Sequence, residues 1–337
     1  MQQQKNNKKY KTNRGNSGFS GLIGIVLIAL VAFLLYSNAQ NIRDWWILRN
    51  YQAPVEISTL AEQISLNNKS RNIFYVNKPT LTSSEAFTSA CPSGVKEQTI
   101  VLGCYHGNQR GIYILDVQDP RLSGVEEVTA GHEFLHAAYD RLSSSERLKV
   151  DKLLTDFYAT ITDQRIIDTI ESYKTSEPND VVNEMHSIFG TEIANLSPEL
   201  EQYYKRYFFN RALVVGFSER YQSEFTSRKT KIAAADAQLQ AYKQQIDSLE
   251  AQLKQQLANI EAQDSQMSIY RSNGNISAYN SMVTPYNNLV YDYNNKINRV
   301  QSLIDSYNNL VNTRNNYALE QGQLIKSLQP QSQKINN

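Results

Sequence analysis

Two histidines and a glutamate form the pattern in this chain with the most specific chemistry. They are His132, Glu133 and His136, in the run His-Glu-Phe-Leu-His. On a helix, residues four apart lie on the same face, so both imidazoles can bind one zinc ion. Glu133 lies about 100° around the helix from His132, where its carboxylate can act as a general base toward a water that zinc polarises. The run therefore predicts a zinc site that activates water.

A zinc site of this kind needs a third protein ligand and one coordination position left for water. Glu184 is the best candidate, because it stands near the start of the amphipathic stretch 183–192. His186 and Glu192 in the same stretch are weaker alternatives, and a solvated helix glutamate is the ordinary interpretation of Glu184. No further histidine follows His136 in the extended pattern His-Glu-x-x-His-x-x-Gly-x-x-His, which excludes the metzincin class.

The arrangement resembles the gluzincin metallopeptidases, in which a glutamate on a later helix completes the zinc site. More narrowly, it is similar to the anthrax lethal-factor-like and Mlc-titration-factor-like families, which carry His-Glu-Phe-x-His, then Glu-x-Phe-Ala, then a Pro-x-Leu-Tyr helix. The matching segments here begin at His132, at Glu184 and at Ser197, within residues 110–210. The resemblance implies a zincin-like fold, zinc ligands His132, His136 and Glu184, and Glu133 as the base.

The resemblance implies two further features. The stretch Gly111–Val117 would be the edge strand along which an extended peptide pairs backbone to backbone. A tyrosine or histidine would stabilise the oxyanion, and Tyr173 is one candidate, although Tyr203 or Tyr204 could serve equally. The chain departs from those families at Ile188, where an acidic residue that supports the histidines is often found.

The helix that carries the motif has its own start signal and apolar face. Ser123 and Glu126 predict a capping box at its beginning. Both motif histidines lie within its apolar stripe, so we expect them to face inward. The other stripe residues are Val125, Val128, Leu135, Tyr139 and Leu142.

The motif lies in a region, 37–217, whose pattern predicts one α+β domain, mainly helical with a small sheet. We expect a short helix over Pro54–Leu66 and a strand over Asn72–Val76. Thr99–Tyr105 and Gly111–Val117 flank a turn and predict a β-hairpin. After Pro120 the pattern is helical up to about residue 217.

The two cysteines, Cys91 and Cys104, enclose 12 residues around the first strand of that hairpin. Because exported proteins favour pairing, we expect a disulfide, which stabilises by about 3 kcal/mol through loop closure. Metal binding by these thiols is less favoured, because they do not form a close Cys-x-x-Cys pair. His106, in the turn, is expected to be an ordinary surface histidine.

Residues 218–328 have a different character and predict a coiled coil. Apolar residues recur in three- and four-residue steps in two arms, separated by the helix breaker 271–275, and Gln256 is the one polar residue in the first seam. The simplest arrangement is an antiparallel helical hairpin; alternatively, each arm pairs with a second molecule. Residues 329–337 are expected to be a disordered tail. The seams are Ile232, Ala235, Leu239, Tyr242, Ile246, Leu249, Leu253 and Ile260, then Val283, Tyr286, Val290, Tyr293, Ile297, Val300, Ile304, Tyr307 and Val311.

The N-terminus predicts a membrane anchor. A basic tail, 1–17, precedes an apolar segment, 18–36, long enough for a helix to cross a bilayer. The positive-inside rule places the tail in the cytoplasm and the rest of the chain outside, with Trp45 and Trp46 suited to the outer interface. A cleaved signal peptide with a site near residues 37–39 is the competing interpretation. Both interpretations export the remainder.

Composition narrows the function classes. The chain has 337 residues, with 34 basic and 33 acidic side chains, so no cationic excess exists to bind nucleic acid. We expect a single-pass, extracytoplasmic zinc metallopeptidase that acts on a peptide or protein. Its coiled coil would serve as a spacer, a gate or an arm for a partner or second copy. Alternatives are a non-catalytic cell-surface or envelope scaffold, and an envelope factor that regulates a wall enzyme through the coiled coil.

Overall fold

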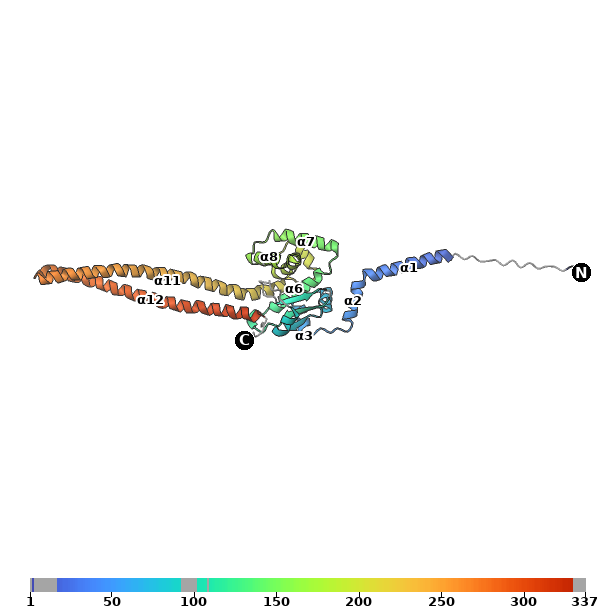
Figure 1. Cartoon of the computed structure of the whole chain (residues 1–337), viewed down its shortest axis with the longest axis horizontal. Coiled ribbons are helices and arrows are strands. Elements are labelled where there is room, and N and C mark those ends of the chain that lie inside the picture. The colour runs from blue at the N-terminus through green and yellow to red at the C-terminus, as the bar shows by residue number, and fades with distance from the viewer. Residues whose placement is uncertain (1, 3–16, 92–101, 108, 330–337) are drawn as a thin grey trace.

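The computed structural model describes residue 2 and residues 17–91, 102–107 and 109–329. Helices dominate, and the described strands form one three-stranded sheet. Figure 1 shows a body of short helices and strands, with α1 (Ser17–Ser37) extending from one side and two long helices from the other. The expected mainly helical α+β class with a small sheet is confirmed. The basic tail, except for residues 2 and 17, and the C-terminal tail after residue 329 lie outside the described residues.

Two N-terminal helices meet at a bend. α1 ends at Ser37, and α2 (Ala39–Leu48) follows after Asn38. In the part of the chain that the structure describes, no single helix passes a length and hydropathy test for crossing a membrane. The segments Gly24–Ser37 and Ala39–Leu48, bent by 59°, pass it only as a pair. Trp45 and Trp46 on α2 are exposed.

The next two elements are helices, of which one was expected. α3 (Val55–Gln63) confirms the helix expected over Pro54–Leu66. The strand expected over Asn72–Val76 is wrong, since these residues belong to helix α4 (Asn68–Val76). The Asn67 side chain caps α4 by accepting a hydrogen bond from the Ser70 backbone N–H at 3.0 Å. Its buried residues, Ser70, Ile73, Phe74 and Val76, follow helical spacing, which outweighs their β-propensity.

The sheet consists of β1 (Thr80–Thr82), β2 (Gly103–His106) and β3 (Gly111–Leu115) in the order β1-β3-β2. β2 and β3 are antiparallel, which confirms the hairpin, although residues 99–101 of its expected first strand lie outside the described part. The prediction that Gly111–Val117 is an edge strand is wrong, because β3 also pairs in parallel with β1. In the order β1-β3-β2, it is β2 of the β-hairpin that forms an edge of the sheet.

The motif helix, α6 (Val125–Tyr139), begins differently from the expectation. Its N-cap is Gly124, at φ +105°, where an added Cβ would lie 2.8 Å from the Phe217 carbonyl oxygen. The predicted capping box is wrong, because the Glu126 carboxylate instead accepts a hydrogen bond from the Val117 backbone N–H at 2.8 Å. This bond links the chain just after the β-hairpin to the first turn of α6. A short 3-10 helix, η1 (Pro120–Leu122), lies between them.

The helices after α6 complete the body and confirm the helical pattern expected after Pro120. Two glycines let α6 and α9 (Val181–Glu192) pack closely. A Cβ at Gly190 on α9 would overlap Leu135 on α6 and lie 2.8 Å from Tyr204, whereas a Cβ at Gly131 on α6 would lie 3.1 Å from Thr191. The other helices are α5 (Ser84–Ala90), α7 (Ser144–Tyr158), α8 (Gln164–Ser176) and α10 (Pro198–Tyr204).

Two long helices, α11 (Ala212–Ser272) and α12 (Ile276–Leu328), run side by side in opposite directions (Figure 1). They form the expected antiparallel hairpin, and the chain reverses within the expected breaker, where Gly274 has φ +69°. The proposed boundary at 217/218 falls inside α11, whose preceding residue, Arg211, donates hydrogen bonds to the carbonyls of Ile193 and Ala194 after α9. At the far end of the chain, α12 returns to the body. There the last turns of α12 form a buried apolar cluster with the body, which consists of Leu122, Val125, Leu324 and Leu328.

Candidate metal centre

Two helices far apart in sequence bring three side chains together. α6 supplies His132 and His136, whose ring centroids lie 4.7 Å apart, and α9 supplies Glu184. The Nε2 atom of each histidine lies 3.4 Å from one oxygen of the Glu184 carboxylate. Around a tetrahedral zinc with bonds of about 2.0–2.1 Å, ligand atoms lie roughly 3.3–3.4 Å apart. The three side chains therefore have the spacing of ligands that share one metal ion.

The electrostatics of Glu184 favour the carboxylate form. The group is buried, which by itself would raise its pKa, but His136, His132 and a hydrogen bond from Tyr173 lower the pKa below the ordinary value. Within the described part of the chain, no well-formed hydrogen bond reaches Glu184 Oε2, although this atom is buried. A buried carboxylate oxygen without a good donor is expensive unless a cation satisfies it. This oxygen fits the role of a metal ligand.

Glu133 lies beside the three candidate ligands and is buried. Burial raises the pKa of its carboxyl group to about 8, with a further raising effect from Glu184. The His136 side chain and a hydrogen bond from the Tyr105 backbone N–H act in the opposite direction. Such a group can accept and return a proton near neutral pH. A metal cation nearby would favour its ionised form.

Strand β2 lies directly over Glu133. A Cβ added to Gly103 would lie 2.7 Å from Glu133 Oε1 and 2.5 Å from Thr129 Cγ2 on α6. The absence of a side chain at Gly103 is therefore what lets the strand approach the carboxylate. Sequence reasoning missed this position, although a glycine inside an expected strand often marks such a close approach.

The three candidate ligands and Glu133 open onto a cleft of about 400 Å³. Tyr173 on α8 lines this cleft next to Glu184, so the tyrosine named as an oxyanion candidate is close to the site. Sequence reasoning did not single out Glu177, Asp180 or Asn183, three polar residues that also line the cleft. The residues lining the rest of the cleft are Gly103, Cys104, Tyr105, Gly107, Asp140, Glu177, Asp180 and Asn183.

The alternative ligands lie elsewhere. His186 is fully buried on the far side of α9, where its Nε2 atom is 2.9 Å from the Tyr203 hydroxyl. Glu192 forms an ion pair with Arg165 at 2.6 Å. Of the three candidates, only Glu184 reaches the histidines of α6.

The two tyrosines offered as equal alternatives to Tyr173 lie in the core, outside the cleft. Tyr203 and Tyr204 pack around His186, and the Tyr204 hydroxyl donates a hydrogen bond to the His186 carbonyl at 2.7 Å. Neither lines the cleft beside Glu184. Ile188, at the position where the resembling families often carry an acid, is buried in the apolar core.

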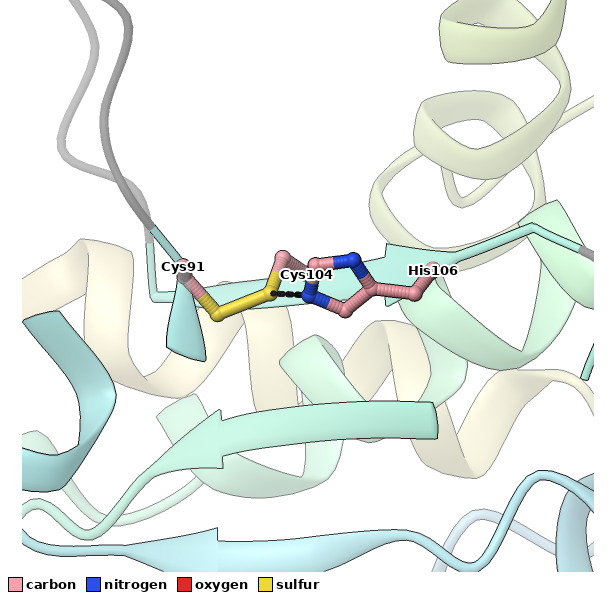
Figure 2. A group of neighbouring side chains, drawn as sticks. All are labelled: Cys91, Cys104 and His106. Carbon is pink, nitrogen blue, oxygen red and sulfur yellow. Dashed lines mark hydrogen bonds between the residues drawn. A yellow bond between two sulfur atoms is a disulfide. The ribbon is translucent and has the colours of Figure 1, made fainter. Parts of the chain in front are cut away.

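The cysteine pair lies at the opposite end of β2 from the turn. Cys91 and Cys104 form the expected disulfide. Figure 2 shows the His106 ring next to this bond. The His106 Nε2 atom lies 3.4 Å from Cys104 Sγ and 2.9 Å from the Ala90 carbonyl oxygen. His106 is thus half-buried and held in place, rather than the ordinary surface histidine expected from its place near the turn.

Comparison with known proteins gives no relative. No protein-family model, no curated protein and no solved structure matches the chain.

Proposed function

We propose that this chain is a zinc-dependent peptidase of zincin-like type, anchored in a membrane with its body on the extracytoplasmic side. The observation that supports this most directly is the convergence of His132, His136 and Glu184 beside a buried Glu133 in an open cleft. This is the side-chain set of the gluzincin metallopeptidases that the sequence resembles.

The chemistry follows from these positions. Zinc, when bound, supplies a Lewis acid that acidifies water and polarises a peptide carbonyl. Glu133 takes the proton of the attacking water and passes it to the leaving amine, for which a raised carboxyl pKa is suited. Tyr173, beside Glu184, is the candidate donor for the oxyanion.

The substrate would bind along β2. Since β2 is the edge strand that borders the cleft, an extended peptide would add to it and bring a scissile bond over Glu133. This replaces Gly111–Val117 in the role first assigned to it.

Two features of the N-terminal part of the chain support the placement at a membrane. The N-terminal residues combine a basic cluster with an apolar segment, and the exposed Trp45 and Trp46 follow on α2. The long hairpin then extends from the side of the body opposite to α1 (Figure 1), where it can act as a spacer or an arm for a partner or a second copy.

A non-catalytic envelope scaffold is the second candidate function. The observation that favours it is the hairpin itself, which takes up a large part of the chain and carries no residue of the cleft. In that case the metal would be structural, and the protein would bind metal without hydrolysing peptides.

The first test is the metal content of the purified chain, measured by elemental mass spectrometry after dialysis. We expect one zinc per chain, and loss or strong weakening of binding in Glu184→Ala. Glu192→Ala is the matched control, because it removes a carboxylate from the same helix outside the cleft. Absence of zinc from the wild type after supplementation would contradict the proposal.

The second test separates catalysis from metal binding. Glu133→Gln should keep its zinc and lose hydrolysis of a peptide library followed by mass spectrometry. Glu127→Gln, on the same helix, should keep both properties. Zinc retained without hydrolysis by the wild type would instead favour the scaffold.

A further inference from the structure

We propose that Cys91, Cys104 and His106 form a second metal site, for zinc or another thiol-binding divalent cation, when the Cys91–Cys104 disulfide is reduced. This site does not depend on the proposed peptidase activity. It involves a different set of side chains, on α5 and β2 rather than on α6 and α9.

The strand geometry places two of the ligands together. In a β-strand, residues two apart point to the same face, so Cys104 and His106 share one face of β2. Their ligand atoms, Cys104 Sγ and His106 Nε2, are 3.4 Å apart (Figure 2). For zinc bonds of about 2.3 Å to sulfur and 2.0–2.1 Å to nitrogen, a tetrahedral site needs roughly 3.5–3.6 Å between these two atoms. The pair already has nearly the required separation.

The third ligand comes from the C-cap of α5. Cys91 is buried, and its Cα lies 5.9 Å from that of Cys104. Breaking the sulfur–sulfur bond would let the two sulfur atoms separate to the roughly 3.8 Å edge of a tetrahedral zinc site, a small movement of one side chain. All three ligand atoms lie within 4.8 Å of one another.

Orientation of the imidazole supports the site. The ring of His106 packs edge-on against Tyr113 of β3, with centroids 5.4 Å apart, and Nε2 faces both Cys104 Sγ and the Ala90 carbonyl oxygen. The nitrogen that would bind a metal is thus directed at the sulfur. Three protein ligands leave a fourth position, which water or the nearby Ala90 oxygen can fill.

The chemistry balances with a dithiol as the reductant. The dithiol supplies two electrons and two protons, the Cys91–Cys104 bond breaks to two thiols, and the dithiol becomes a disulfide. Binding a divalent cation then releases the two thiol protons, because thiolate is the ligand form. The proton that His106 Nε2 donates to the Ala90 carbonyl moves to Nδ1 by exchange with water, because an unprotonated ring nitrogen is the ligand form. Gly103 and Tyr105 flank Cys104 in the strand. Gly103 lies close to Glu133, and the Tyr105 backbone N–H donates a hydrogen bond to it, so a shift of Cys104 on metal binding would also move the wall of the cleft.

Cobalt(II) spectroscopy of the full chain in detergent tests the site. The chain is reduced with a water-soluble phosphine, the phosphine is removed without oxygen, and cobalt chloride is added. We expect a thiolate-to-cobalt absorption band in the reduced chain that saturates once both metal sites are filled, and no such band in the oxidised chain. His132, His136 and Glu184 contain no sulfur, so their site cannot give this band.

Variants assign the band to its ligands. Cys104→Ser should abolish it, and His106→Gln should weaken cobalt affinity at least about tenfold, since even changes outside the ligand shell cost that much. Glu184→Gln should leave the band unchanged, which separates this site from the candidate metal centre. Circular dichroism of the reduced chain should retain the helical and strand signal.

The proposal fails if the folded, reduced wild type gives no thiolate band. It also fails if His106→Gln binds cobalt as tightly as the wild type, or if reduction unfolds the chain. None of these outcomes would alter the zinc test on Glu184.

Discussion

The body and the helical hairpin use helix packing in opposite ways. In the body, α6 and α9 approach through glycines, and the neighbours Leu135 and Tyr204 are fully buried. In the hairpin, α11 and α12 share a narrow seam in which Gln256 is one of few buried side chains. Polar contacts across the seam, such as Arg314 with Asp236 at 2.9 Å, set its register.

This difference in packing shows which part of the molecule must hold its side chains in exact positions. Side chains on two helices can share a metal ion only if they lie within a fraction of an ångström of the required positions, and close packing of α6 against α9 fixes His132, His136 and Glu184 in this way. A long hairpin needs only its register and stiffness, which scattered contacts provide. Substitutions should therefore cost far more at the α6–α9 contact than in the seam.

The largest effect on stability is expected for Gly190→Ala. The added methyl group would overlap Leu135 and lie 2.8 Å from Tyr204, and both neighbours are fully buried. We expect a loss of about 3 kcal/mol in the free energy of unfolding, measured by chemical denaturation, together with weaker zinc binding. Gly216→Ala on α11, with no atom within 4 Å of the added Cβ, should be neutral or slightly stabilising. Equal behaviour of the two variants would contradict the close-packing argument.

Gly103→Ala should act on the chemistry more than on stability. Its methyl group would lie 2.7 Å from Glu133 Oε1, so the carboxylate or the strand must move. A displacement of about 1 Å at a catalytic group costs roughly 100-fold in rate, which we expect in kcat for peptide hydrolysis with zinc retained. Gly107→Ala lines the same cleft, but its Cβ would meet Asp140 at an ordinary 3.6 Å and should leave kcat unchanged.

Gln256→Ala tests the seam of the hairpin. The side chain donates a hydrogen bond to the Leu289 carbonyl at 2.9 Å and accepts one from Lys296 at 2.7 Å. We expect a loss of about 1 kcal/mol, seen as a lower denaturation midpoint, with zinc content unchanged. The adjacent, exposed Gln255→Ala is the control and should have no effect. A loss of zinc in Gln256→Ala would show that the hairpin and the metal centre are coupled.

The smallest effect concerns acid stability of the body. Hydrogen bonds from Ser143, then from Arg206, lower the pKa of Glu146 from 4.5 to about 2. The folded carboxylate therefore stabilises the protein above pH 4.5, and this contribution is lost as pH falls from 4.5 toward 2. Glu146→Gln should be less stable than the wild type near pH 6, with the difference shrinking across that window in denaturation series. Glu250→Gln, exposed on the hairpin, should follow the wild-type pH profile.

Local signals predicted much of the molecule. The His-Glu-x-x-His spacing, the helix breaker at 271–275, the β-hairpin and the cysteine pair each depend on residues close together in sequence, and the structure contains the motif helix, the reversal, the hairpin and the disulfide where they were expected. Two of the errors were competitions between alternative local structures, which packing and hydrogen bonds in the folded chain decided. Asn72–Val76 has β-forming residues, but the Asn67 cap and burial against the body make it helical. Glu126 was expected to cap its own helix, but the incoming Val117 N–H takes its carboxylate.

The sequence by itself determined which side chains could bind a metal and that His132 and His136 share one helix face, because helical periodicity is a property of the local backbone. The sequence ranked Glu184 ahead of His186 and Glu192, but only the tertiary structure places Glu184 beside the two histidines. That placement depends on how α9 is rotated when Gly190 packs against Leu135, a contact between residues more than fifty positions apart. The same holds for β2, whose place at the sheet edge over Glu133 follows from the pairing of β1 with β3.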